Sequence, residues 1–227
     1  MLLNIDKNAK TVKGQKKGYL TGILYLAPST LSGYQVCPFA KVAGCEDSCL
    51  NTAGRGAMNS TQKARIAKTK YFMEDREAFM EQLVKEIRAL IKKAEKMGLI
   101  PVVRLNGTSD ILWERIGVRG EGGIGYSNLM EMFPELQFYD YTKHIKRNVP
   151  KNYHITFSYS PMYGKKSDHN MAVVFKGKIP VKFMGRKVVD GDENDLRFLD
   201  QRNVIVALKA KGKAKKDTSG FVVEMIA

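Results

Sequence analysis

Residues 19–49 have the sequence YLTGILYLAPSTLSGYQVCPFAKVAGCEDSC, in which an apolar run passes into a segment that holds all three cysteines of the chain. The run is rich in β-branched and aromatic side chains and stops at Pro28, which predicts a buried strand. Cys37, Cys45 and Cys49 follow it in a segment with turn-forming residues. We therefore expect a cysteine loop directly after the first strand of the fold.

Apolar side chains recur at helical spacing after the cysteines. The pattern predicts a helix over residues 61–72 and a stronger helix over residues 76–97, which Gly98 ends. Short apolar runs that each end in polar residues then follow at 100–105, 137–141, 153–158, 171–175 and 204–208. Strands separated by helices or crossover loops favour an α/β fold with a mainly parallel sheet. We expect this sheet to be curled as a partial TIM-like barrel.

The composition is typical of one domain. A chain of 227 residues that is 44% hydrophobic can bury one sizeable core, and no linker or repeat divides it. We predict a single domain over residues 1–227, with a basic N-terminal arm at 1–18 and a flexible basic run at 209–219. Apolar stretches are far shorter than the roughly 20 residues that span a bilayer, which argues against a membrane protein. The polar and basic start differs from a signal peptide, so we expect a cytoplasmic location.

The clustering of the cysteines indicates metal chemistry. Cys37, Cys45 and Cys49 fall within 13 residues, and an odd number of thiols in a reducing compartment does not make a disulfide framework. Thiolates are soft ligands for zinc or iron–sulfur centres. Zinc would need a fourth protein ligand, and all three histidines are distant in sequence. Three cysteines instead fit a [4Fe–4S] cluster with one iron left open, while zinc and inert core thiols stay as alternatives.

Polar residues follow the predicted strands where each strand ends, and ligands in such folds bind beyond those ends. The predicted ligand-binding residues are Arg55, Arg104, Asn106, Thr108 and Ser158. Lys143, which is suited to hold a carboxylate or phosphate, and Asp110 are the predicted catalytic residues. Ordinary turns, helix caps and solvated lysines have the same composition, and this second interpretation stays open for each residue.

The charge favours a polyanionic partner. The formal net charge is +15, and the segment 142–187 holds 11 Lys and Arg residues against one acid. No helix-turn-helix, zinc-finger or RNA-recognition signature accompanies these residues, so we expect weak DNA or RNA binding without sequence preference. The residues predicted to contact nucleic acid are Lys165, Lys166, Lys176, Lys178, Lys209, Lys211, Lys213, Lys215 and Lys216. A solvated surface on a basic protein explains the same pattern.

Five segments together closely resemble the bacteriophage gene product 88 family, across nearly the whole chain. They are YLTGILYLAPSTLSGYQVCPFAKVAGCEDSCLNTAGRG at 19–56, QKARIAKTKYF at 62–72, PVVRLNGTSDILWE at 101–114, FYDYTK at 138–143 and VIVALKAKGKAKKDTSGFVV at 204–223. The resemblance implies a viral protein that acts in the host cytoplasm. It implies no settled biochemical activity.

A more distant resemblance is to radical S-adenosylmethionine (radical SAM) enzymes, which are partial α/β barrels with a three-cysteine loop after the first strand. The order of strand, cysteine loop, helix and strand is shared. The spacing departs from the CxxxCxxC of those enzymes, because seven residues separate Cys37 from Cys45 and three separate Cys45 from Cys49. Residues 106–110 stand where those enzymes carry the Gly-Gly-Glu that holds the methionyl amine. The resemblance therefore implies a cluster more strongly than it implies S-adenosylmethionine.

We hypothesise that the chain is a phage-encoded, radical-SAM-like [4Fe–4S] protein with a ligand site at the strand ends above the cluster. Whether it is an enzyme stays open, and an enzymatic form would reductively cleave S-adenosylmethionine or a related substrate. The alternative is a non-specific nucleic-acid-binding protein in which the metal centre is structural. A third hypothesis is an inhibitor of a host protein that needs no metal.

Overall fold

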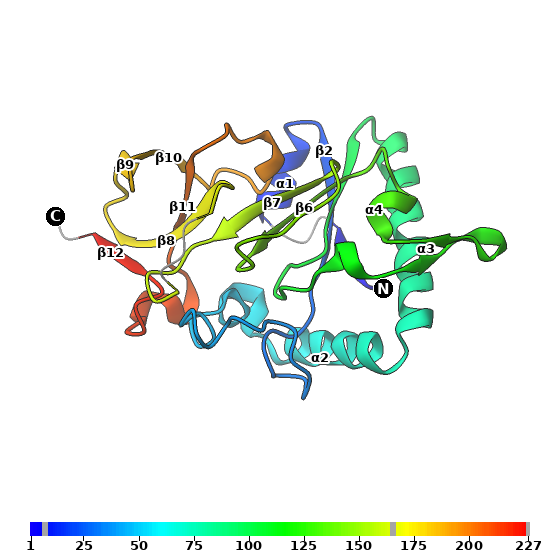
Figure 1. Ribbon diagram of the computed structural model, residues 1–227, viewed down its shortest axis with the longest axis horizontal. Helices are drawn as coiled ribbons and strands as arrows, with labels where there is room; N and C mark the ends of the chain where they lie inside the picture. Colours follow the sequence, from blue (N-terminus) through cyan, green and yellow to red (C-terminus); the bar gives the residue numbers. More distant parts are fainter. Residues whose placement is uncertain (6–8, 164–166, 226–227) are drawn as a thin grey trace.

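The computed structural model describes residues 1–5, 9–163 and 167–225, and its centre is a ten-stranded, mostly parallel sheet (Figure 1). The strands are β1 (Leu3–Ile5), β2 (Tyr19–Leu24), β3 (Ile100–Arg104), β6 (Gln137–Thr142), β7 (Tyr153–Ser158), β8 (Met171–Gly177), β9 (Lys182–Phe183), β10 (Arg186–Asp190), β11 (Ile205–Lys209) and β12 (Val223–Met225). Their order is β1-β2-β3-β6-β7-β8-β11-β10-β9, with β12 beside β8. Among these described strands, β1–β2 and β9–β10 pair antiparallel and the other neighbours pair parallel. The predicted α/β fold with a mainly parallel sheet is confirmed.

Within the described ranges, four α-helices and a small hairpin accompany the sheet. They are α1 (Ala9–Gln15), α2 (Asn59–Glu74), α3 (Arg76–Lys96), α4 (Leu129–Met132) and the pair β4 (Val118–Arg119) and β5 (Gly125–Tyr126). The two predicted helices agree with α2 and α3 to within two residues at each end. The side chain of Asp75 accepts a hydrogen bond from the Ala78 amide at 3.2 Å, which caps the start of α3. No helix in the described part of the chain is long and apolar enough to cross a membrane.

The two ends of the chain are more structured than the sequence predicted. The expected basic arm contributes β1 and α1, and the side chains of Leu2 and Leu3 are buried. The expected flexible run contains Lys209 of β11 and a 3₁₀-helix at Gly212–Lys216. That 3₁₀-helix contacts another at Leu50–Thr52, just after the last cysteine. Both segments therefore belong to the folded structure around the sheet.

Alternate residues along the strands bury against different partners, because successive side chains point to opposite faces of a sheet. Leu24, Val103 and Phe138 belong to one cluster with the apolar stripe of α3. A Cβ on Gly22 would lie 2.9 Å from a methyl group of Leu90, so α3 packs directly on β2. On the opposite face, Val102 and Tyr139 pack with Leu196 from the segment between β10 and β11. The apolar residues of α3 thus determine which face of the sheet is left for a site.

Parallel strands β2, β3, β6, β7 and β8 lie side by side in chain order. This winding brings the carboxyl ends of five strands to the same edge of the sheet. The hydrogen-bonded path runs from β1 at one end to β9 at the other, so the described strands do not close into a barrel. The residues that follow these strand ends are the ones from which a site can be built.

Candidate metal and ligand cavity

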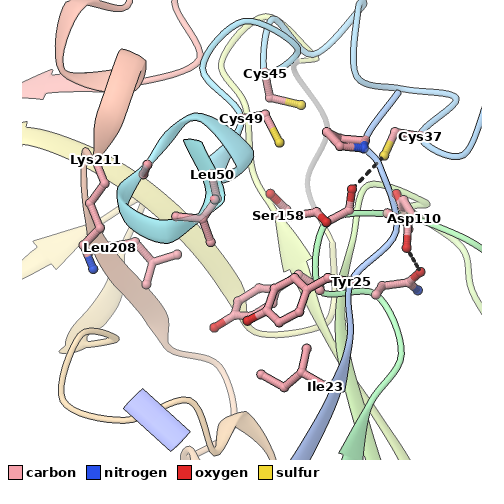
Figure 2. Close-up of a pocket in the computed structure, with 18 of the residues that line it drawn as sticks. Ile23, Tyr25, Cys37, Cys45, Cys49, Leu50, Asp110, Ser158, Leu208 and Lys211 are labelled. Atoms are coloured by element: carbon pink, nitrogen blue, oxygen red, sulfur yellow. Dashed lines mark hydrogen bonds between the residues drawn. The ribbon is translucent and has the colours of Figure 1, made fainter. Parts of the chain in front are cut away.

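A cavity of about 1150 Å³ lies at the carboxyl ends of the parallel strands. Its floor includes Ile23 of β2, Arg104 of β3 and Tyr141 of β6. Leu24, Val103 and Leu105, which are chain neighbours of Ile23 and Arg104, belong to the cluster around α3 on the other side of the sheet. The cysteine segment and the start of α2 form the opposite wall. Figure 2 shows side chains from these separate elements converging on one space.

The three cysteines all line this cavity as free thiols. Figure 2 shows Cys45 and Cys49 side by side, with Cys37 across from them. Burial, with smaller contributions from the charges of Cys49, Asp110 and Cys45, raises the pKa of the Cys37 thiol to about 12. Burial also raises the pKa of Cys45 and Cys49. The sulfurs are therefore close enough for a negative charge on one thiolate to affect the pKa of another.

The thiols do not form a preformed site for a single ion. Within residues 1–5, 9–163 and 167–225, no group of three His, Cys, Asp or Glu side chains is placed to hold one metal ion. The sulfur of Cys37 lies 3.6 Å from the carbonyl oxygen of Thr108, and that of Cys45 lies 3.6 Å from the carbonyl oxygen of Ala40. Metal ligation by the cysteines therefore stays a prediction.

The C-terminal residues 217–219, which we call the clasp, hold the cysteine segment in place. Ser219 Oγ donates to the Gly44 carbonyl at 2.7 Å, and Ser48 Oγ donates to Asp217 at 2.5 Å. Gly44 has a φ of +66°, and a Cβ there would lie 2.7 Å from Ser219 Oγ. Figure 1 shows the red C-terminal segment beside the blue cysteine segment. Residues far apart in sequence thus fix the loop that carries the thiols.

We expect Asp217→Ala to loosen this loop and expose the thiols. Asp217 accepts hydrogen bonds from Ser48, Ser219 and the Val222 amide. Losing about 1.5 kcal/mol of hydrogen bonding would make loop opening roughly ten times more frequent. The rate of reaction with an aromatic disulfide reagent should rise by the same factor, while Asp168→Ala at an exposed site should leave it unchanged. Equal rates for both variants would show that the clasp does not control access.

Lys143 and Asp110 are brought together at the end of β6, next to the thiols. The Lys143 ammonium donates to the carbonyl oxygen of Ser158 at 2.8 Å and to its hydroxyl at 3.1 Å. Asp110 accepts from the Lys143 amide at 2.8 Å and from the Thr142 hydroxyl at 2.7 Å. Burial lowers the pKa of Lys143, and the nearby Cys45 and Asp110 oppose this shift. Among the described residues, the Lys143 ammonium forms no ion pair with a carboxylate.

Arg65 of α2 is a second buried cation in the cavity, and the sequence analysis missed it. Its guanidinium lies over the ring of Tyr25, 4.7 Å from the centroid, and donates to the side-chain oxygen of Asn51. Its Nε has no hydrogen-bond partner among the described residues. The charge of Cys49 raises the pKa of Arg65, against the stronger lowering by burial. The signal available in the sequence was an arginine at helical spacing from Thr69, on the buried face of α2.

Asn106 and Thr108 lie at the cavity as predicted, but their polar groups are already engaged. Asn106 Oδ1 accepts from Ser109 Oγ at 2.9 Å and from the Trp113 indole at 3.1 Å. The hydroxyl of Thr108 donates to the carbonyl of Leu26 at 2.5 Å. These contacts hold the turn after β3, so both residues organise the cavity wall and have little capacity left for a ligand.

Arg104 also has an internal partner. Its guanidinium donates to Asp195 at 2.8 Å and lies over the ring of Tyr141, 4.7 Å from the centroid. Asp195 further accepts from the hydroxyls of Tyr139 and Tyr141, both at 3.4 Å. Asp195 was not among the residues predicted from the sequence. The pair forms a polar floor beneath the cavity.

The remaining predicted residues lie at the rim or outside the cavity. Arg55 is exposed at the rim. Lys209 and Lys211, predicted to bind nucleic acid, also line the cavity, while Lys178, Lys213, Lys215 and Lys216 are exposed elsewhere. Lys176 forms an ion pair with Glu224 at 3.0 Å. Lys165 and Lys166 lie outside the described residues.

A family model described as gene product 88 matches residues 1–225 of the chain. The match confirms the resemblance to that bacteriophage family over the full length of the sheet and the cavity. It does not support the more distant resemblance to radical SAM enzymes, which stays a prediction. No curated protein and no solved structure matches the chain significantly.

Proposed function

We propose, since this chain belongs to the gene product 88 family, that it is a phage-encoded iron–sulfur protein of the host cytoplasm. In this proposal Cys37, Cys45 and Cys49 hold a [4Fe–4S] cluster, and a ligand binds above its open iron. Lys143 and Ser158 lie at the strand ends beside the thiols, where they would orient that ligand.

The observation that carries the proposal is the balance of charge around the three thiols in the cavity. Three thiols share one cavity with two buried cations, Lys143 and Arg65, neither of which is ion-paired to a carboxylate within the described residues. A buried cation without a counter-ion is costly. Thiolates bound to a cluster would supply the missing negative charge. Neutral thiols would leave Lys143 with only the nearby Asp110, which does not form an ion pair with it, and would leave Arg65 with no nearby carboxylate among the described residues.

The donor set suits a cluster better than zinc. Structural zinc gathers four ligands around one point, and no single-ion group of this kind exists among the described side chains. In a cubane cluster each thiolate binds a different iron, so its sulfurs stand farther apart. No cysteine other than these three and no histidine of the described residues lines the cavity, so the proposal assigns the fourth iron to an added ligand. An amino-carboxylate such as S-adenosylmethionine is the ligand that we propose for that position.

We further propose that the sheet is a partial TIM-like barrel. The parallel strands from β2 to β8 follow chain order, as successive units of a barrel do. The cavity lies at their carboxyl ends, on the face opposite α3, where barrel enzymes place their sites. The order of strand, cysteine loop, helix and strand adds to this support.

Anaerobic reconstitution tests the cluster. Full-length protein treated with ferrous iron and sulfide should bind about four irons and four sulfides per chain and absorb broadly near roughly 400 nm. Adding S-adenosylmethionine to the reduced protein should perturb its paramagnetic resonance spectrum. One zinc per chain, with no iron retained, would contradict the cluster. An unchanged spectrum with the ligand would contradict only the open-iron site.

The nucleic-acid-binding alternative has weaker support. Lys176 and Lys211 are engaged in ion pairs with Glu224 and Asp192. Lys209 and Lys211 line the cavity, so their charge is directed at its contents as well as at solvent. We therefore favour the cavity as the site of function.

A further inference from the structure

The cavity extends beyond the thiols into a second lobe with an apolar floor. Ile23 of β2, Val174 of β8 and Leu208 of β11 line this part, together with Leu50 from the turn after the cysteines. Figure 2 shows Tyr25 between the cysteines and Ile23, with Leu50 and Leu208 to one side. Pockets that bind drug-sized molecules ordinarily measure roughly 300–1,000 Å³, so the whole cavity is large enough for one. Protein atoms alone form this lobe, so a ligand could bind there without a metal centre.

Cations outnumber carboxylates in the described lining of the cavity. The described lining of the whole cavity includes eight Lys and Arg residues and four Asp and Glu residues. Lys10 and Lys211 share one carboxylate, Asp192, at 2.9 and 2.6 Å, and the Lys209 amide also donates to it. Partial burial of Asp192 raises its pKa, but these hydrogen bonds hold the pKa well below its usual range. One carboxylate therefore cannot balance the surrounding charge.

Exposed cations complete the rim. Arg55 and Lys209 line the cavity, and neither forms an ion pair with a carboxylate of the described residues. The second carboxylate of the lobe, Asp195, is already paired with Arg104. A ligand with negative charge at this end would therefore meet an excess of positive charge without displacing an existing partner.

We propose that the second lobe binds a small amphiphilic organic anion. Its apolar body would lie over Ile23, Val174 and Leu208, and its acidic group, a carboxylate or phosphate, would face Arg55 and Lys209 at the rim. A nucleic-acid backbone would leave the apolar floor uncovered, and a neutral lipid would leave the cations without a counter-charge. The proposal goes beyond the iron–sulfur function, because it does not depend on the cluster.

Binding of 8-anilino-1-naphthalenesulfonate to the full-length protein tests the proposal. We expect saturable binding that the neutral analogue N-phenyl-1-naphthylamine does not match in affinity. Arg55→Glu combined with Lys209→Glu should weaken the anionic probe at least about tenfold, the effect of reversing two nearby charges. The matched control, Arg202→Glu combined with Lys178→Glu, reverses two exposed charges that do not line the cavity and should leave affinity unchanged.

Three further comparisons decide the outcome. Leu208→Glu should abolish probe binding if it folds, and the rim variant alone tests the proposal if it does not. Competition by 1-naphthyl phosphate and 1-naphthoate identifies which acidic group the rim prefers. Removing iron should leave probe binding intact, so a failure of the cluster proposal is distinguishable from a failure here. Equal binding by the rim and control variants, or by the neutral analogue, would overturn the proposal.

Discussion

Replacing Cys49 by alanine should remove the cluster from the reconstituted protein. Its sulfur lies at the start of the 3₁₀-helix Leu50–Thr52, where it accepts a hydrogen bond from the Asn51 amide at 3.5 Å. The Asn51 amide therefore helps to hold the Cys49 sulfur in an orientation that faces the cavity, where it would bind iron. Because each thiolate binds a separate iron in the proposed cluster, the loss of one should reduce iron to under about a tenth of the wild-type content.

Cys37→Ala and Cys45→Ala should give the same result, because all three thiols line one cavity. Val42→Ala, an exposed position in the same segment, is the matched control and should retain iron. Iron and sulfide analysis measures the loss, and circular dichroism measures whether each variant still folds. Reconstitution should raise the unfolding temperature of the wild type, and this rise should be absent from the variants that lose iron. Full metal content in any cysteine variant would show that this cysteine is only a core residue.

Local pattern predicted much of this fold. The alternation and composition of the segments 137–141 and 153–158 identified β6 and β7 almost to the residue, because each strand is apolar and ends at polar side chains. The apolar stripe of residues 76–97 identified α3 in the same way. Parallel strands end at one edge of a sheet, and Asp110 and Lys143, both selected because they follow strand ends, do lie side by side there.

Other features depend on pairings that no local pattern encodes. Strand β10 has polar and apolar residues without a clear alternation, and it becomes a strand because Val188 pairs with Ile205 of β11. The role of Asn106 depends on Trp113, whose indole takes the oxygen that a ligand would otherwise use. Arg65 became a candidate only when α2 placed its side chain over Tyr25, a residue 40 positions earlier in the chain. Each of these outcomes requires long-range contacts.

Asp195→Ala should produce the largest loss of stability among single substitutions in the cavity floor. The Arg104 guanidinium is buried and its only ion pair shorter than 3 Å among the described residues is with Asp195, at 2.8 Å. Removing Asp195 leaves the buried guanidinium with only the more distant Asp140, 3.9 Å away, and breaking a buried pair typically costs about 3–5 kcal/mol. Tyr139 and Tyr141 would also lose the acceptor of their hydroxyl groups. Urea unfolding followed by circular dichroism measures the change.

The double variant Arg104→Met, Asp195→Leu separates the buried charge from the packing. Removing both charged groups should recover most of the stability, since apolar replacements of a buried pair are often neutral or stabilising. The matched surface pair, Lys17 and Glu193, should show little change when either partner is replaced. If Asp195→Ala and the double variant were equally unstable, the loss would come from packing and the ion pair would have no special role.

The pH dependence of stability gives an independent test of the same pair. Burial raises the pKa of Asp195, but the charges of Arg104, Lys10 and Arg197, together with the hydrogen bond from Arg104, outweigh this effect and hold the pKa below its usual value. A carboxyl group whose pKa is lower in the folded state stabilises the protein above its unfolded pKa, about 3.9. That contribution is lost as the pH falls toward the folded pKa. The wild type should therefore lose stability below about pH 4 more steeply than the double variant, which carries no carboxylate at this position.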